Sequence, residues 1–183
     1  MPEAGGATNQ AGIYYQNCVA AVQLAELLDL RNVPARERVV GVRVEAPGDV
    51  DDIVVDYADG HRHFLSAKLS LRSGGRAWDH LWADVQAEAT ATTTRPDDRL
   101  SIVVSERTSA SDSVGDLCSL AARSVDANEF RRRLTTSQSK VLQTLGRTDI
   151  DFTSRFELLR RVEVIVLTRP IHTDAGLSPM LAG

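Results

Sequence analysis

The sequence predicts an α/β fold in which a mixed sheet is flanked by helices. Two patterns support this prediction: apolar residues recur at helical spacing in some segments and alternate with polar residues in others. Together they give the order helix, three strands, helix and strand, followed by extra C-terminal helices and a last strand. The length of 183 residues suits one domain, which we expect over residues 1–170, with 171–183 as a tail or a linker to absent C-terminal domains.

The composition excludes several classes of protein. A net charge of −4 argues against a generally basic surface for nucleic acid and leaves only local basic patches. Cys18 and Cys118 fit no metal-ligand spacing and are expected to be reduced thiols. Because the chain has neither a membrane-spanning apolar run nor a signal-peptide pattern, we expect no membrane partner and a cytoplasmic location.

The first helix is predicted from Gly12 to Leu30, after a small and polar segment at 1–9 that should lie outside any element. Its apolar stripe is expected to consist of Tyr14, Cys18, Val22, Ala25 and Leu28. Gln16 lies off that stripe, near the beginning of a helix that should pack beside the strands, and is a candidate for supporting a site there.

Three short strands follow between Val39 and Leu71. In the first strand, one face carries Val40, Val42 and Val44, and Glu45 follows the last of them. In the second strand, from Asp52 to Tyr57, alternation separates Ile53, Val55 and Tyr57 from Asp52, Val54 and Asp56. In the third strand, Ser66 and Lys68 point the same way.

The turn between the second and third strands decides which aspartate meets Lys68. Asp59-Gly60 is a strong hairpin signal. A two-residue loop there would place Asp51 opposite Lys68. A loop one residue longer would place Asp52 opposite Lys68 and keep the aliphatic residues of both strands together on the far face. We prefer the longer loop. Asp52 is therefore the first candidate for the aspartate opposite Lys68, and Asp51 is the second.

These side chains suit the hydrolysis of phosphodiesters. Carboxylates such as Glu45 and Asp52 can hold a hard cation, which polarises a phosphate and lowers the pKa of a bound water. A lysine such as Lys68 can orient or deprotonate that water. The alternative is that all three form ordinary ion pairs at strand ends. His61 and His63 lack further His or Cys ligands nearby and are expected as exposed turn residues.

A second helix and a fourth strand follow the turn at Ser73-Gly74-Gly75. The buried face of this helix is predicted from Trp78, Leu81, Trp82, Val85 and Ala89. Gln86 lies near the edge of that face. Leu100, Ile102 and Val104 alternate as the fourth strand, and the helical crossover is long enough for parallel pairing with the third strand.

The rest of the chain says less about function. Helices are expected at 112–125, 126–145 and 153–161, before a last strand of Val162, Val164 and Val166. Arg131, Arg132 and Arg133 fall in the second of these helices and could hold DNA phosphates, although a run of arginines is more often a solvated face. Arg72 and Arg76, which follow the third strand, could also contact phosphates or could simply be surface charge.

The order of elements and these motifs resemble the PD-(D/E)xK nuclease superfamily, whose restriction-endonuclease-like core has the order αβββαβ. There the second strand carries a metal-binding Asp, matched by Asp52, and the third carries (D/E)xK, matched by Ser66-Ala67-Lys68. The likeness spans about residues 5–90 and is closer to the DNA endonuclease domains of bacterial anti-phage proteins that carry SAVED or STAND NTPase modules. The motifs shared with that branch are Gly12-Ile13-Tyr14-Tyr15-Gln16, Glu45, Asp49-Val50-Asp51-Asp52, Ser66-Ala67-Lys68, and Trp78 or Trp82.

This resemblance implies a Mg²⁺- or Mn²⁺-dependent endonuclease. Its substrate would be double-stranded DNA, and it would form homo-oligomers when absent domains activate it. The resemblance assigns Asp52, Glu45 and the backbone carbonyl of Ala67 to the metal. It assigns Lys68 to the attacking water.

The supporting residues implied by the resemblance are Gln16 and Gln86, on the two helices beside the strands. Ser66 departs from the pattern, since this position normally holds Glu, Asp or Gln. A neutral, short hydroxyl would weaken direct ligation of a metal. The alternative function is therefore a catalytically weakened nuclease fold retained for DNA binding or assembly.

Overall fold

The computed structural model describes residues 4–28, 33–44, 53–145 and 150–168, with side chains from residue 10 onward. Six helices and five strands lie in these parts of the chain. In chain order they are α1 (Ala4–Glu26), β1 (Val39–Val44), β2 (Ile53–Tyr57), β3 (Arg62–Lys68), α2 (Arg76–Thr90), β4 (Arg99–Val104), α3 (Ser109–Ala122), α4 (Ala127–Arg133), α5 (Thr136–Thr144), α6 (Phe152–Arg161) and β5 (Val162–Val166).

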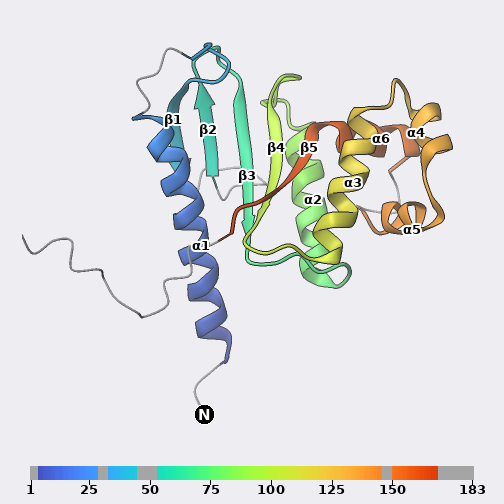
Figure 1. Ribbon diagram of the computed structural model, residues 1–183, viewed down its shortest axis with the longest axis horizontal. Helices are drawn as coiled ribbons and strands as arrows, with labels where there is room; N and C mark the ends of the chain where they lie inside the picture. The colour runs from blue at the N-terminus through green and yellow to red at the C-terminus, as the bar shows by residue number, and fades with distance from the viewer. Residues whose placement is uncertain (1–3, 29–32, 45–52, 146–149, 169–183) are drawn as a thin grey trace, which may run out of the picture.

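The strands form one mixed sheet in the order β1-β2-β3-β4-β5. Neighbours from β1 to β3 pair antiparallel, and neighbours from β3 to β5 pair parallel. Figure 1 shows α1 running alongside β1 to β3, with α3 to α6 gathered beyond β4 and β5. The predicted α/β class, the predicted order of elements as far as the fourth strand and the parallel pairing of the third and fourth strands are confirmed.

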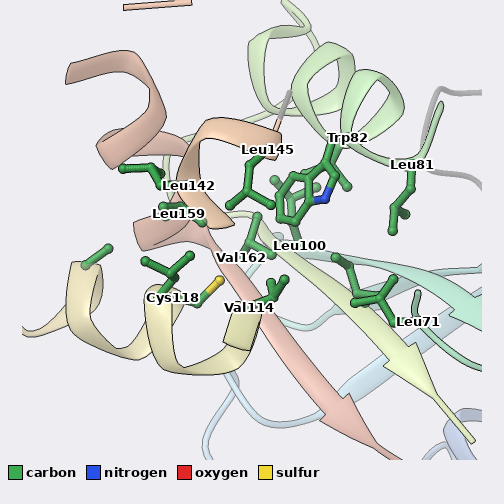
Figure 2. Packing of buried hydrophobic residues seen from close by; sticks show 14 of the residues in the cluster. Leu71, Leu81, Trp82, Leu100, Val114, Cys118, Leu142, Leu145, Leu159 and Val162 are labelled. Carbon is green, nitrogen blue, oxygen red and sulfur yellow. The ribbon is translucent and has the colours of Figure 1, made fainter. Parts of the chain in front are cut away.

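Each face of the sheet carries its own hydrophobic core. On one face, α1 packs against residues of β1 to β4, and the buried members are Tyr15, Val19, Ala20, Val39, Ile53, Val55, Leu65 and Val103. The hydrophobic core on the other face is larger and includes residues of α2, α3 and α6. Figure 2 shows Trp82, Leu100 and Val162 meeting there from a helix and two strands. Since full burial of one such side chain contributes roughly 1.5–3 kcal/mol, the two cores hold the sheet between its helices.

Helix α1 begins earlier than predicted and buries a different stripe. Tyr15 is buried, whereas Tyr14, Val22 and Leu28 are exposed, so the predicted stripe was wrong. The expectation that the first nine residues lie outside any element was also wrong, because α1 starts at Ala4. Its only charged residue is the last one, so small and apolar residues occur all round the helix and their periodicity cannot select the buried side.

A bulge in β1 alters the predicted alternation of that strand. The register with β2 shifts between Val39 and Gly41, so one residue of β1 has no partner. Val39 is buried and Val42 packs against the core under α1, whereas Val40 is 56% exposed. Because an extra residue reverses the inside and outside positions of a strand, Val40 does not share the buried side of Val42 as predicted.

Strands β2 and β3 pair in a register that differs by two residues from the preferred one. Ile53 pairs with Leu65 rather than with Ala67, so the predicted register, which set Asp52 opposite Lys68, was wrong. A shift by an even number of residues keeps every side chain on its predicted face. Ile53 and Leu65 accordingly lie in the core under α1, with the even-numbered positions of both strands on the opposite face.

The cause of this shift is the position of the hairpin loop. Tyr57 N–H donates to the carbonyl of His61 (3.0 Å), so the three residues Ala58 to Gly60 form the loop. Gly60 has φ +91°, the conformation that a three-residue hairpin requires near its end. The loop therefore has the preferred length but begins one residue earlier than predicted.

The single helix predicted over 126–145 is two helices, α4 and α5. The chain turns at Thr135, whose hydroxyl accepts from the Gln138 N–H (3.2 Å) while the Gln138 side chain accepts from the Thr135 N–H (2.9 Å). This capping box marks the beginning of a separate helix, α5, and its Thr-x-x-Gln signature is present in the sequence. No helix in the described parts of the chain combines the length and apolarity needed to cross a bilayer.

Candidate functional site

The residues predicted to carry the chemistry of β3 lie at its C-terminal end. Ser66 and Lys68 follow Phe64 at two-residue intervals, so they share the side of the sheet that packs against α2 and α3. In the parallel ladder they lie beside Ile102 and Val104. Ser66 is only 3% exposed, whereas Lys68 is partly exposed. The lysine, much more than the serine, is therefore within reach of a ligand.

The backbone of Ala67 faces β2. Ser105 N–H donates to the carbonyl of Lys68 (3.2 Å), so the backbone groups of Lys68 face β4. Since successive residues of a strand direct their backbone groups to opposite neighbours, the Ala67 carbonyl is directed to the β2 side. The described ladder between β2 and β3 ends two residues before Ala67, at Ile53 and Leu65. The Ala67 carbonyl thus lies just beyond the described start of β2.

The loops that follow β3 and β4 are tied together beside this strand end. The Ser105 hydroxyl donates to the Leu69 carbonyl (2.6 Å), and the Thr108 hydroxyl donates to the Leu71 carbonyl (2.8 Å). Thr108 also caps α3 through a capping box with Ser111. These bonds hold the end of β3 against β4 and α3, so Lys68 extends from a rigid support.

The predicted carboxylates Glu45, Asp51 and Asp52 lie outside the described residues. The residues that flank them, Val44 and Ile53, pair with each other at the end of the sheet where β3 finishes. Within the described ranges, no cluster of three or more His, Cys, Asp or Glu side chains could hold a metal. The oxygen atoms at this end of β3 include the Ala67 carbonyl, a kind of ligand that a hard cation prefers, and the Ser66 hydroxyl, which is a weaker ligand.

The two supporting glutamines lie on different sides of the sheet. Gln16 follows the buried Tyr15 on α1, the helix that covers the face opposite to Lys68. The Tyr15 hydroxyl donates to the Leu167 carbonyl (3.0 Å), which puts this part of α1 near the C-terminal ends of the parallel strands. Gln86 instead lines a cavity of about 260 Å³ with residues of α6, and no residue of β3 is among its described lining residues.

The candidate phosphate ligands fall into two separate groups. Arg72 and Arg76 are exposed and flank the turn that follows β3, close in the chain to Lys68. The arginines of α4 belong to a helix that packs against α3 and α6 rather than against β3. There the Arg131 guanidinium lies 4.1 Å from the centre of the Phe152 ring, and Arg133 pairs with Glu129 at 3.3 Å.

The two histidines of the β2–β3 hairpin are buried, so the expectation of exposed turn residues was wrong. His61 stacks on Tyr57, with ring centres 4.3 Å apart, and its Nδ1 lies 2.5 Å from the Asp59 carboxylate. His63 Nε2 lies 2.6 Å from the Ser101 hydroxyl. His63 occupies the same odd-numbered face as Leu65, and strand alternation could have identified it as buried.

Comparisons with known proteins give no match: no family model, no curated protein and no solved structure matches this chain. The function is therefore inferred from the residues and their geometry.

Proposed function

We propose that the chain is a metal-dependent endonuclease that hydrolyses double-stranded DNA. The observation that supports the proposal is that Lys68 and the Ala67 carbonyl lie at the same end of the sheet as the paired strand ends Val44 and Ile53. The antiparallel β1–β3 unit followed by a parallel β4 also agrees with the resemblance to the PD-(D/E)xK superfamily.

In this proposal the oxygen ligands of Mg²⁺ or Mn²⁺ are Asp52, Glu45 and the Ala67 carbonyl, with Asp51 in reserve for Asp52. A bound divalent ion supplies charge stabilisation at the phosphate and lowers the pKa of water. The ammonium group of Lys68 orients the attacking water and offsets the negative charge that develops on the phosphate.

The proposed substrate requires cationic groups beside the cutting site. Arg72 and Arg76 supply two exposed guanidinium groups in the turn directly after β3, where they can contact DNA phosphates. The likeness to anti-phage endonuclease domains supports a role in defence against phage DNA, with activation through homo-oligomers. Such an effector would meet its DNA in the cytoplasm.

Ser66 favours a second candidate function. Its hydroxyl replaces the carboxylate or amide of the (D/E)xK pattern, and at 3% exposure it sits in the core rather than in solvent. A chain with this serine can retain the nuclease fold as a module for DNA binding or assembly while cutting slowly or not at all. The two functions differ in one measurable property, which is cleavage of bound DNA.

Supercoiled plasmid incubated with Mg²⁺ separates the two candidates. The endonuclease proposal expects nicked and linear products that EDTA abolishes and that Lys68→Ala and Asp52→Asn each reduce by about a hundredfold or more. Lys140→Ala, at an exposed lysine of α5, is the matched control and should cut normally. Undiminished cleavage by Lys68→Ala contradicts the proposal. Retention of the plasmid in a gel without any cleavage favours the binding module instead.

A further inference from the structure

The outer face of α1, which is turned away from the sheet, is apolar and exposed. The residues of α1 that are buried against the sheet are Tyr15, Val19 and Ala20. Away from them, Leu24 is 45% exposed, and Leu28, in the turn that follows the helix, is 79% exposed. A helix that is apolar on all sides is normally buried on all sides. The outer face of α1 is therefore expected to have a partner.

The exposed residues of this face follow the spacing of a seam between two helices. They recur at alternate intervals of four and three residues, and they are Gln10, Tyr14, Asn17, Ala21, Leu24 and Leu28. A repeat of 3.5 residues keeps one narrow stripe of a helix against a second helix along its whole length. This stripe therefore fits another helix better than a strand or a loop.

The absence of charge on the stripe favours a second copy of the same helix. The charged residue of α1 is Glu26, in its last turn and outside the stripe. When a helix pairs with its own copy about a two-fold axis, the same surface lies on both sides of the contact, so charges near the axis would repel each other. A stripe without charges avoids that repulsion, and it has no cation to attract DNA phosphates.

Asn17 suits the position on the two-fold axis. It is a polar residue in the middle of the stripe, and its amide both donates and accepts, so two copies can hydrogen-bond to each other. A single asparagine in an apolar seam specifies the register of the two helices. In an antiparallel pair centred there, residues equally far from Asn17 on its two sides meet. Ala21 then meets the partner's Ile13, and Leu28 meets the partner's Gly6, so large residues lie opposite small ones.

The N-terminal half of α1 requires such a contact to be stable. Figure 1 shows this half continuing past the ends of β1 and β2, and none of its described side chains before Tyr15 belongs to either hydrophobic core. It contains Gly5, Gly6 and Gly12, and glycine within a helix is destabilising. Since a helix without tertiary packing is marginal in water, pairing with the partner's C-terminal half would stabilise it.

The contact is large enough for a reversible dimer. The 23 residues of α1 give a helix about 34 Å long at about 1.5 Å per residue. A strip of that length and about 10 Å wide buries on the order of 1,000 Å² over the two copies once their side chains interlock. Specific interfaces begin at about this size, and those near the lower limit are weak and reversible.

We propose that two copies of the chain associate through the outer faces of their α1 helices, which pack antiparallel with the two Asn17 amides at the two-fold axis. Because α1 covers the face of the sheet opposite to Lys68, the proposed cleavage site stays open in both copies. The proposed function includes homo-oligomers, and α1 supplies a surface for them. The dimer itself does not depend on cleavage, so association measured without DNA or metal tests it separately.

Sedimentation equilibrium of the protein over a range of concentrations measures the dimer. Leu24→Glu should raise the dissociation constant of the dimer about a hundredfold or more, because each dimer would bury two carboxylates. Val22→Glu is the matched control: Val22 is 43% exposed, against 45% for Leu24, but lies on a different side of α1 from the stripe. It should associate as the unmodified protein does. Thermal unfolding of both variants verifies that they fold.

Disulfide crosslinking tests the orientation of the two helices. In a Cys18→Ser background, where the remaining Cys118 is buried, Asn17→Cys should crosslink to its own copy under mild oxidation. Leu28→Cys should not, because the two copies of residue 28 would be about 33 Å apart.

Three results would overturn the proposal. Crosslinking of Leu28→Cys would show a parallel pair. A dimer that Leu24→Glu leaves intact would show that another surface associates. A protein that remains a monomer at every soluble concentration would leave the outer face of α1 to a different partner.

Discussion

His63 Nε2 and the Ser101 hydroxyl lie 2.6 Å apart between β3 and β4, where both residues are almost completely buried. Burial of the imidazole, with the nearby charges of Arg99 and His61, lowers the pKa of His63 from 6.5 to about 4. The neutral ring is therefore the form that the fold accommodates. The ring forms a hydrogen bond with the Ser101 hydroxyl, and this bond replaces one that the ring would form with water.

This pair predicts that stability falls as the solution becomes acidic. Because the pKa of His63 is lower in the folded state, the unfolded chain binds the proton more readily, and the free energy of unfolding decreases as pH drops from 6.5 toward 4. The loss from this residue is roughly 3 kcal/mol and levels off below pH 4. Urea unfolding at a series of pH values measures it.

His63→Gln is the variant that isolates this effect, because glutamine cannot titrate but can still hydrogen-bond with Ser101. Its stability at pH 7.5 should be lower than that of the unmodified protein because of poorer packing, and its decrease between pH 6.5 and pH 4 should be smaller. An identical pH dependence in both proteins would show that other groups cause the acid sensitivity.

Asp98 provides a second stability prediction. Its carboxylate has a fully buried side chain and accepts from the backbone N–H groups of Arg62 and Arg95 (2.7 and 2.8 Å) and from the Arg62 guanidinium (2.7 Å). Burial alone would raise its pKa, but the hydrogen bonds from Arg95 and Arg62 outweigh burial and hold the pKa below its ordinary value of 3.8. The carboxylate thus joins the start of β3 to the start of β4.

Asp98→Ala should lower the free energy of unfolding by about 2–4 kcal/mol, because it leaves two backbone N–H groups without their acceptor and removes the ion pair with Arg62. Asp97→Ala changes the exposed neighbouring carboxylate and should alter stability by less than about 0.5 kcal/mol. Since the lowered pKa of Asp98 stabilises the fold above pH 3.8, its contribution should disappear as the pH falls through its folded pKa. Equal stabilities of the two variants would contradict this account.

The sequence predicted the centre of the fold better than its ends, for physical reasons. The faces of β2, β4 and α2 were predicted correctly because side chains such as Trp78 and Trp82 on α2, and Leu100 and Ile102 on β4, follow a clear periodicity. Helix α1 lacks charges that would mark its solvent side, and the bulge at Val40 depends on pairing with β2. Neither the buried side of α1 nor the bulge in β1 can be predicted from local periodicity.

The site shows the same division between local and long-range information. Alternation correctly put Ser66 and Lys68 on one face, since that depends only on the strand itself. The burial of Ser66 was not predictable, because its face of the sheet belongs to a core that includes helices from later in the chain. The position of Gln86 facing α6 has the same cause, since α6 is distant in sequence.

The two groups of arginines give a prediction for DNA binding. If DNA meets the protein at the end of β3, replacing Arg72 and Arg76 by glutamine should weaken duplex binding and reduce the slope of log affinity against log salt by about 1 to 2. The same replacement of Arg131 and Arg132 on α4 should change the slope less. Fluorescence anisotropy with a labelled duplex at several salt concentrations measures both slopes. A larger effect of the α4 variant would place the DNA on the helical side of the molecule.

Replacing Ser66 by glutamate gives the sharpest prediction for the metal site. The variant restores the carboxylate of the (D/E)xK pattern at a position that is 3% exposed, two residues before Lys68. Without a divalent ion, burying a carboxylate there should lower the free energy of unfolding by about 2 kcal/mol. With Mg²⁺, the added ligand should recover much of that stability, because an ion that binds only the folded state stabilises it.

Thermal unfolding in EDTA and in Mg²⁺ measures this recovery, and plasmid cleavage is the second readout. Ser66→Met, whose side chain is about as long as that of glutamate but has no oxygen ligand, is the matched control and should show a much smaller effect of Mg²⁺ on its unfolding temperature. We expect Ser66→Glu also to cut faster than the unmodified protein, since a third carboxylate strengthens the hold on the ion. A Ser66→Glu protein that folds but gains neither stability nor cleavage from Mg²⁺ would show that no metal site exists at this end of β3.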